Sequence, residues 1–555
     1  MRLPSNPLDL VECAKDIVDV CHGSKSSRVA LYQNLSRWME NGRGDGSKSL
    51  CNTLYHHIDR LASHLFSPAE LRFSIDFETM YDQKILAQGE VASRLLSRMW
   101  EQKNIDQTYA CGVAVSLLYG AGCLKQMWTG KGITANLLMP WQFGVYREDL
   151  TGVRDQEAIC ETSLLTIHEV RRVLSQFGDP AQERKLFEKI KAHATSGAPS
   201  DVGPTNYFHQ ILSSATLNTS GSPEPPRPGG IVDLSTPIHI LAPEVQIPLV
   251  KYHEMYVIDE EIDDYCTIQI IEPDVLISPR FKRKNRCAPK TLPYTLIQPN
   301  QTPGYFWGRS ELLDLLEPQG LMSDLLSDTR RLMGMQFDKL LAFTGDEGMT
   351  DERYAQFRGS GYIGLAPGAG VTDLTPKLPE ATFQYINLIS KLMEQISGFD
   401  NILSGQGESG VRAGVHADTL VRTASPRLRD RSLLVERQCA DAADVSLELL
   451  ETYDSTVYHS NDPKAPVEFV LKQLPEDRRV SVDSHSASPI YEQDHKDLIG
   501  FGVKHGFIDG ESAIDLLPLP MKDKLKMRYR EAQEAKAKMI QEHPELLPKP
   551  KAPKA

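Results

Sequence analysis

Apolar residues recur at helical spacing over long parts of the chain, and shorter segments alternate strictly between apolar and polar positions. The spacing predicts helices over 8–20, 28–39, 50–66 and 84–100. Strict alternation over 71–77 predicts a half-buried strand. The N-terminal part of the chain is therefore expected to combine helices with strands.

The following part of the chain predicts a layer of short strands. An apolar segment over 108–118 ends at Gly120 and Gly122, and a turn over 129–132 joins two strand patterns into a hairpin. Pro and Gly dominate 195–235, which predicts a linker or an exposed loop. The other elements predicted here are strands over 123–128, 133–139, 158–164, 238–241, 256–258, 266–271 and 275–277 and a helix over 167–177.

Two helical arms are predicted in the second half of the chain, over 308–337 and 381–396. Pro318 removes a backbone donor inside the first arm, so we expect a separate short helix over 309–316 and an arm helix from residue 319. Apolar residues on both arms are spread too widely for one buried stripe, which favours neighbours on more than one side.

The insertion between the arms, 343–375, is rich in turn residues and contains two short strand patterns, 362–365 and 371–374, which we expect to pair. Gly-rich residues 403–410 predict a loop. The C-terminal elements predicted after it are a long helix over 426–453, strands over 467–471 and 480–482, and helices over 494–500, 511–517 and 521–541.

Composition indicates a folded protein with several sub-domains. The chain has 555 residues, of which 41% are hydrophobic and 24% charged. No apolar run is long enough to cross a bilayer, and the N-terminus lacks the apolar core of a signal peptide, so we expect a protein made in the cytosol. Nine cysteines without a Cys-x-x-Cys pair favour reduced thiols.

The net charge of −13 argues against a protein whose whole surface grips nucleic acid. It is compatible with a protein that encloses duplex DNA without holding it. Each phosphate that Lys or Arg neutralises adds affinity through counterion release, and affinity slows a moving polymer. The densest basic cluster is a candidate for a minor DNA contact and consists of Lys282, Arg283, Lys284 and Arg286.

No catalytic, cofactor or metal motif stands out. The segment 405–410 matches the dinucleotide-binding fingerprint in its letters, but a helix precedes it where that motif requires a strand. The runs around Lys25 and Lys48 lack the spacing of a phosphate-binding loop and are interpreted as turns with Ser caps. The histidine-containing groups, for which metal binding is not favoured, are His56, His57 and Asp59, and Asp483, His485, Asp494 and His495.

The order of these elements resembles that of the tailed-bacteriophage portal proteins, the head-to-tail connector family. In that family, the chain runs through a stem helix, a clip, a second stem helix, a tunnel loop and a long wing helix. This sequence has the same order: a helical arm, a compact insertion, a second arm, a Gly-rich loop and a long helix. The resemblance covers most of the chain through order more than through invariant motifs. The segments that carry it most directly are 119–128, 137–140, 293–310, 399–403 and 506–517.

The resemblance implies an α+β portal-protein fold that assembles as a ring homo-oligomer. The parts that it implies are an α/β wing (1–308), a first stem helix region (309–342), a small α/β clip (343–378), a second stem helix (379–402), a tunnel loop (403–425), the long wing helix with closing strands (426–490), a helical crown (491–543) and a disordered tail (544–555).

The resemblance also implies a structural role without enzymatic activity or cofactors. The ring, usually of twelve copies, would stand at one capsid vertex of the virion after assembly in the host cytoplasm. Double-stranded DNA would be packaged and ejected through its channel. The expected partners are further copies of the chain, the terminase large subunit, the major capsid and scaffolding proteins and a tail adaptor, and no membrane is expected.

Two sets of site residues follow from this interpretation. The tunnel loop is expected to face DNA through Gly405, Gly407, Gly410, Arg412, Gly414, His416 and Arg422. The clip is expected to dock the motor through Asp346, Glu347, Asp351, Glu352, Arg353 and Arg358.

Two other interpretations of the sequence remain open. One is a different ring or adaptor protein of a virion, and the other is an enzyme with an unrecognised site in the α/β layer. Particle mass separates a ring from a typical enzyme.

Overall fold

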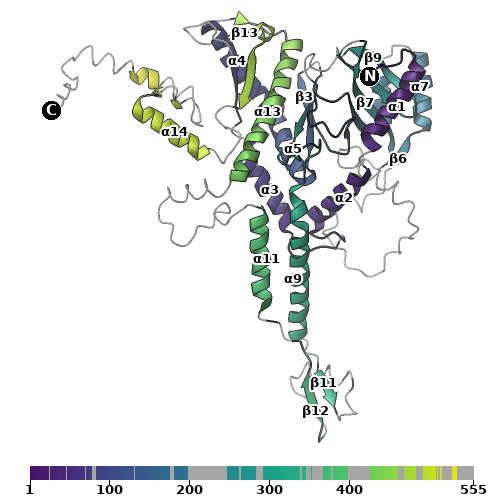
Figure 1. Cartoon of the computed structure of the whole chain (residues 1–555), viewed down its shortest axis with the longest axis vertical. Helices are drawn as coiled ribbons and strands as arrows, with labels where there is room; N and C mark the ends of the chain where they lie inside the picture. Colours follow the sequence, from purple (N-terminus) through teal and green to yellow (C-terminus); the bar gives the residue numbers. More distant parts are fainter. Residues whose placement is uncertain are drawn as a thin grey trace, which may run out of the picture.

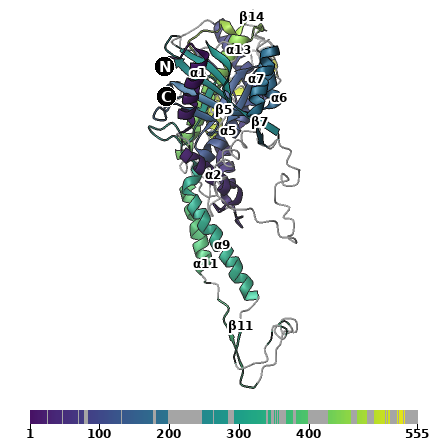
Figure 2. The same cartoon turned by 90° about the vertical axis from the view of Figure 1, so that its right-hand side faces the viewer.

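The computed structural model combines helices and strands in a broad body, from which two helices extend as a long arm (Figures 1 and 2). A small strand pair lies at the far end of this arm, which we call the tip. The structure describes residues 1–23, 26–45, 47–68, 71–77, 83–129, 132–175, 180–197, 247–261, 264–282, 292–337, 341–344, 367–376, 381–397, 426–459, 468–482, 492–507 and 528–533, with isolated residues between 350 and 379 and between 509 and 535.

A six-stranded antiparallel sheet forms one side of the body. Its order is β4-β5-β7-β8-β9, with β6 pairing to β7. Cys160, Met255 and Cys266 on one face pack against the N-terminal helix α1, whereas Ile159 and Tyr256 face the opposite way. The bounds are α1 Pro7–Gly23, β4 Phe143–Val145, β5 Ala158–Thr166, β6 Thr195–Gly197, β7 Ile247–Asp259, β8 Asp264–Ile271 and β9 Val275–Lys282.

A three-stranded sheet packs against the second face of the larger sheet. Its order is β10-β2-β3, with β2 spanning Gly122–Trp128, β3 Ile133–Leu138 and β10 Tyr294–Ile297. Alternation along β2 directs Cys123 toward the larger sheet and Leu124 toward the helices behind. The first five residues of β2, Gly122–Gln126, are therefore buried on both faces, whereas β3 alternates between buried or half-buried and exposed positions.

The main core lies between this small sheet and the longest helix, α13 (Pro426–Tyr453). Polar side chains from other elements bond to α13, and one of them is Gln126 of β2, whose Nε2 donates to the carbonyl of Ala442 at 2.8 Å. Trp100 Nε1 donates to Ser446 Oγ at 3.0 Å, and Tyr109 hydroxyl donates to the carbonyl of Val435 at 2.8 Å. The other helices of the body are α2 Ser26–Asn41, α3 Thr53–Leu65, α4 Gln83–Gln102, α5 Ile105–Tyr119, α6 Ile167–Leu174 and α7 Pro180–Ala192.

Smaller elements complete the described chain. The strand β1 pairs with β15, and β13 pairs with β14. The arm consists of α9 and α11, and the tip of β11 and β12. The bounds are β1 Phe73–Phe77, β13 Tyr458–His459, β14 Glu468–Phe469, β15 Arg478–Val482, the 3-10 helices η5 Glu311–Asp314 and η6 Leu471–Gln473, α9 Leu316–Phe337, α11 Ala381–Ser397, β11 Leu341–Thr344, β12 Gly370–Asp373 and α14 Glu492–His505.

The mixed helix and strand content is confirmed, and most predicted helices lie within a few residues of their expected bounds. The expected break at Pro318 is placed wrongly, because α9 begins at Leu316. Pro318 occupies the first turn, where the missing N–H has no intrahelical acceptor in any case, so the helix tolerates it. A short helix does precede α9, as predicted, but it is the four-residue 3-10 helix η5 and is shorter than the predicted 309–316.

Two of the strand predictions need correction, and the predicted pairing within the tip stays untested. β7 extends over thirteen residues, far beyond the predicted 256–258, because it pairs with β5 and β8 on both sides. At the tip, Gly370–Asp373 pairs with Leu341–Thr344, whereas the predicted partner 362–365 lies outside the described residues. The predicted strand 467–471 is reduced to β14, because η6 begins at Leu471.

Candidate assembly surface on the arm

The arm is a helical hairpin whose two helices contact each other and, among the described residues, meet the body at one end only. Figures 1 and 2 both show α9 and α11 side by side, projecting beyond the body. Met322 is the one buried apolar side chain of α9, and Ile389 is its counterpart on α11. Two helices with so little buried apolar surface have weak support from their own packing.

Large apolar side chains remain exposed along both helices. Phe337 at the end of α9 is 88% exposed, and Phe383 at the start of α11 is 54% exposed. Hydrophobic residues exposed singly are ordinary, but nine of them on two adjacent helices indicate an interaction surface. The exposed apolar residues of the arm are Leu321, Met333, Met335, Phe337, Phe383, Tyr385, Leu388, Leu392 and Ile396.

The residues on α11 follow a regular helical stripe. Tyr385, Leu388, Leu392 and Ile396 are separated by three, four and four positions, so their side chains lie on one face of the helix. This spacing is typical of a helix that packs along its length against another helix. We call these four residues the α11 stripe. All four remain exposed although α9 packs beside them.

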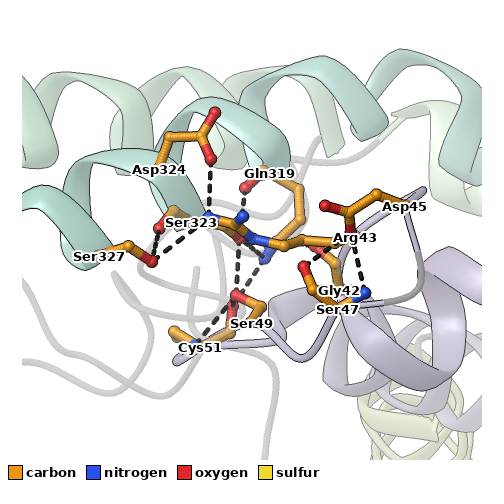
Figure 3. A network of polar contacts seen from close by, with 10 residues as sticks. All are labelled: Gly42, Arg43, Asp45, Ser47, Ser49, Cys51, Gln319, Ser323, Asp324 and Ser327. Carbon is orange, nitrogen blue, oxygen red and sulfur yellow. Dashed lines mark hydrogen bonds and ion pairs between the residues drawn. The ribbon is translucent and has the colours of Figure 1, made fainter.

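A polar joint attaches the arm to the body (Figure 3). Gln319, Ser323 and Ser327 lie four residues apart on α9 and face the loop between α2 and α3. The Gln319 amide donates to the carbonyl of Cys51 at 2.6 Å and accepts from Thr53 Oγ1 at 2.5 Å. Because Gln319 is fully buried, these bonds fix the rotation of α9 about its axis.

Charged groups extend this joint to the surface and to the long helix. Arg43 donates to Asp324 at 2.7 Å and to Ser327 at 3.3 Å, as Figure 3 shows. Just before α9 in the chain, Glu311 of η5 pairs with the buried Arg431 of α13 at 3.0 Å. Directional polar contacts therefore connect the arm to the loop after α2, and connect η5, which directly precedes α9, to α13.

Most of the predicted site residues lie outside the described residues. This applies to every predicted residue of the tunnel loop, namely Gly405, Gly407, Gly410, Arg412, Gly414, His416 and Arg422. It applies equally to Asp346, Glu347, Asp351, Arg353 and Arg358 of the clip and to Arg283, Lys284 and Arg286 of the basic cluster. Glu352 is described and exposed, and Lys282 is the last residue of β9.

The histidine groups gain no metal-site geometry in the described part of the chain. His57 is partly buried on α3, and its loss of contact with water lowers the pKa of its imidazole. No group of three or more His, Cys, Asp or Glu side chains among the described residues is arranged to hold a metal ion. Asp483 and His485 lie outside the described residues, and the side chains of Asp494 and His495 are likewise not described.

A buried ionic network in the body was missed by sequence reasoning. Lys125 of β2 pairs with Glu161 of β5 and, at 3.2 Å, with Glu254 of β7. Tyr294 hydroxyl donates to Glu161 at 3.0 Å, and Tyr256 hydroxyl donates to Glu254 at 2.9 Å. The signal was the pair Lys125-Gln126 in the middle of a strand whose other residues are apolar or Gly.

The two carboxyl groups of this network are not equivalent. Burial raises the pKa of Glu161 more than Lys125 lowers it, and the neighbouring Glu254 raises it further. Burial would also raise the pKa of Glu254, but Lys125 and the hydroxyl groups of Tyr256 and Tyr252 together hold it below its usual value. All three charged side chains are at least nine-tenths buried, so this network is closed to a substrate and favours a structural role.

No protein-family model matches this sequence, and no curated protein matches it. The class of molecule that the geometry defines is a mixed helix and strand body with a projecting helical hairpin. No described helix is long and apolar enough to cross a membrane.

Proposed function

We propose that the chain is a portal protein of a tailed bacteriophage, a structural protein that forms a ring around double-stranded DNA at one capsid vertex. The observation that carries this proposal is the α11 stripe, four exposed apolar residues on one face of a helix that already has a partner in its own chain. A ring of identical copies covers such a stripe with the arm of the next copy, because a head-to-tail interface repeats until it closes.

The order of the parts supports the same assignment. In this proposal the body corresponds to the wing, the arm to the stem and the tip to the clip, and α13 is the long wing helix. The α+β portal fold, the twelve-copy ring and the virion location belong to this proposal. So do the partners: duplex DNA, terminase, capsid and scaffolding proteins and a tail adaptor.

Rotational order in a ring demands that every arm leaves its body at the same angle. The joint around Gln319 and Ser323 supplies that constraint through buried hydrogen bonds to the loop that follows α2. A purely apolar joint would allow small rotations at little cost, whereas misaligned hydrogen bonds leave buried polar groups without partners. The polar joint therefore suits an arm that must meet a neighbour in one register.

The experiment that tests the proposal is the mass of the purified protein, measured by light scattering and checked by negative-stain imaging. The wild-type chain is expected to form rings. A double substitution, Leu388→Asp and Leu392→Asp, is expected to yield folded monomers, because it places two charges in the middle of the stripe, where a neighbouring arm would have to bury them. Asn387→Asp is the matched control, since it adds a charge in the same turn outside the stripe.

A monomeric wild-type mass over a wide range of concentration and salt would overturn the proposal.

The proposed roles of the tunnel loop and the clip are tested by assays of DNA packaging and of terminase docking. Deleting residues 405–414 is expected to leave rings intact and to impair DNA packaging or retention. Reversing Asp346 and Glu347 to lysine is expected to weaken terminase docking while ring formation continues.

A further inference from the structure

A cleft of about 470 Å³ opens in the body, at the opposite end from the tip. It lies where the last turns of α4, the β2–β3 hairpin and the end of α13 meet, next to β13. A volume of this size accommodates one or two large side chains or a small ligand. The residues that line it include Arg98, Lys103, Trp128, Ile133, Leu450 and Asp454.

The inner part of the cleft is apolar. Ile133 and Leu450 are buried, and Leu95 and Met99 are partly buried against the main core beside them. Trp128 forms a wall, and its ring stacks on Tyr453 at 5.7 Å between centroids and 17° between planes. Because this stacking holds the indole, the wall is in place before any ligand arrives.

The rim of the cleft carries positive charge. The side chains of Arg98 and Lys103 are exposed, and neither forms an ion pair with another described residue. Lys103 lies over the hairpin turn, where a Cβ added to Gly132 would be 3.2 Å from its Nζ. The facing carboxylate, Asp454, already accepts from Tyr458 hydroxyl at 2.7 Å and from the Thr456 amide at 2.9 Å.

We propose that this cleft is a docking site for an acidic peptide segment of another protein. A large apolar side chain of the segment lies against Trp128 and Ile133, and flanking carboxylates pair with Arg98 and Lys103. Charge complementarity supports this occupant, because a cationic rim stands out in a chain of net charge −13. An acidic peptide fits better than DNA, since a narrow apolar floor offers nothing to a phosphate backbone.

The proposal is independent of ring formation and is tested by fluorescence anisotropy. The probe is a fluorescein-labelled decapeptide that alternates glutamate and leucine around a central phenylalanine. Saturable binding is expected, and the double substitution Arg98→Glu and Lys103→Glu is expected to weaken it about tenfold or more. The matched control is Arg94→Glu, one turn earlier on α4 and outside the cleft, where the arginine pairs with the exposed Glu90.

Three comparison probes decide whether the cleft recognises both parts of the segment. A peptide with lysine in place of glutamate, a peptide with serine in place of its apolar residues, and a labelled DNA duplex are each expected to bind at least tenfold more weakly than the first probe. Equal binding by any of them would overturn the proposal. So would an absence of saturable binding by the acidic peptide, or an equal loss of affinity in Arg94→Glu. Arg98 and Lys103 are exposed, so unchanged thermal midpoints are expected for their variants.

Discussion

The body and the arm bury their residues in opposite ways. In the body, the long helix α13 carries fully buried residues such as Val435, Cys439 and Leu447, and other elements cover it from several sides. In the arm, α11 buries one apolar residue and leaves its stripe exposed. Both helices have apolar residues at helical spacing, so the spacing alone does not distinguish a covered helix from an exposed one.

The difference shows where the chain completes its own core and where it does not. The hydrophobic effect scales with the apolar area removed from water, and the body removes that area within one chain. Among the described residues the arm achieves this only in part, which is the basis of our proposal that a second copy of the chain covers the rest. Buried polar side chains mark the regions that the chain covers by itself. Lys125 is buried in the body and Gln319 in the joint.

The largest effect is expected from the buried network of the body. Lys125→Met leaves Glu161 and Glu254 facing each other without a cation, which should lower the free energy of unfolding by about 3–5 kcal/mol at pH 7. Urea denaturation of the wild-type chain and the variant measures this difference in the free energy of unfolding. Lys15→Met is the control, because the partner of Lys15, Asp274, is exposed and its pair contributes little.

The pH dependence of that effect has a definite sign. The pKa of Glu254 is lowered in the folded chain, so its stabilising contribution is present above its unfolded pKa of about 4.3 and is lost as pH falls through the folded value. The pKa of Glu161 is raised, so its contribution is present below about 4.3 and is lost as pH rises through the folded value. The deficit of Lys125→Met should therefore shrink as pH falls, and a constant deficit would contradict this account.

The same substitution in the two regions provides the most direct comparison. Leu96→Ala in α4 opens a cavity in the main core and should cost about 2–5 kcal/mol. Leu388→Ala in the α11 stripe, where the side chain is 50% exposed, should cost less than about 1 kcal/mol in the isolated chain. Urea denaturation of dilute monomer measures both. Equal costs would mean that the arm is covered within its own chain.

The joint should show an intermediate effect. Gln319→Ala removes bonds to Cys51 and Thr53 and should cost about 1–2 kcal/mol. It should also broaden the distribution of distances between spin labels on the arm and the body, measured by pulsed electron resonance. Thr329→Ala, further along α9, is the control for that distribution. An unchanged distance distribution would show that apolar packing alone sets the angle of the arm.

The smallest effect is expected at Pro318. Pro318→Ala should change stability by less than about 1 kcal/mol, because proline in the first turn of α9 sacrifices no intrahelical hydrogen bond. Thermal unfolding of the variant measures the change. A large gain in stability would instead indicate that the proline strains the start of the arm.

The sequence by itself determined the elements whose signals are local. Its apolar spacing predicted α13 with the observed bounds, 426–453, and α11 within one residue of its end. Helical periodicity and capping depend on residues a few positions apart, so they can be recognised before any tertiary contact is known. The exposed apolar positions of the arm were likewise visible in the sequence, although their exposure was not.

Tertiary structure decided the features that depend on distant residues. The joint brings Cys51 to Gln319 across 268 positions of the chain, and Lys125 meets Glu161 and Glu254 only because two sheets stack. β7 gained its length, and β12 its observed partner, from pairing with strands elsewhere in the chain. Strand pairing and ion pairing carry no fixed sequence spacing, so local patterns cannot specify them. The exposure of a helix face is decided in the same way, because it depends on whether a distant part of the chain packs against that face.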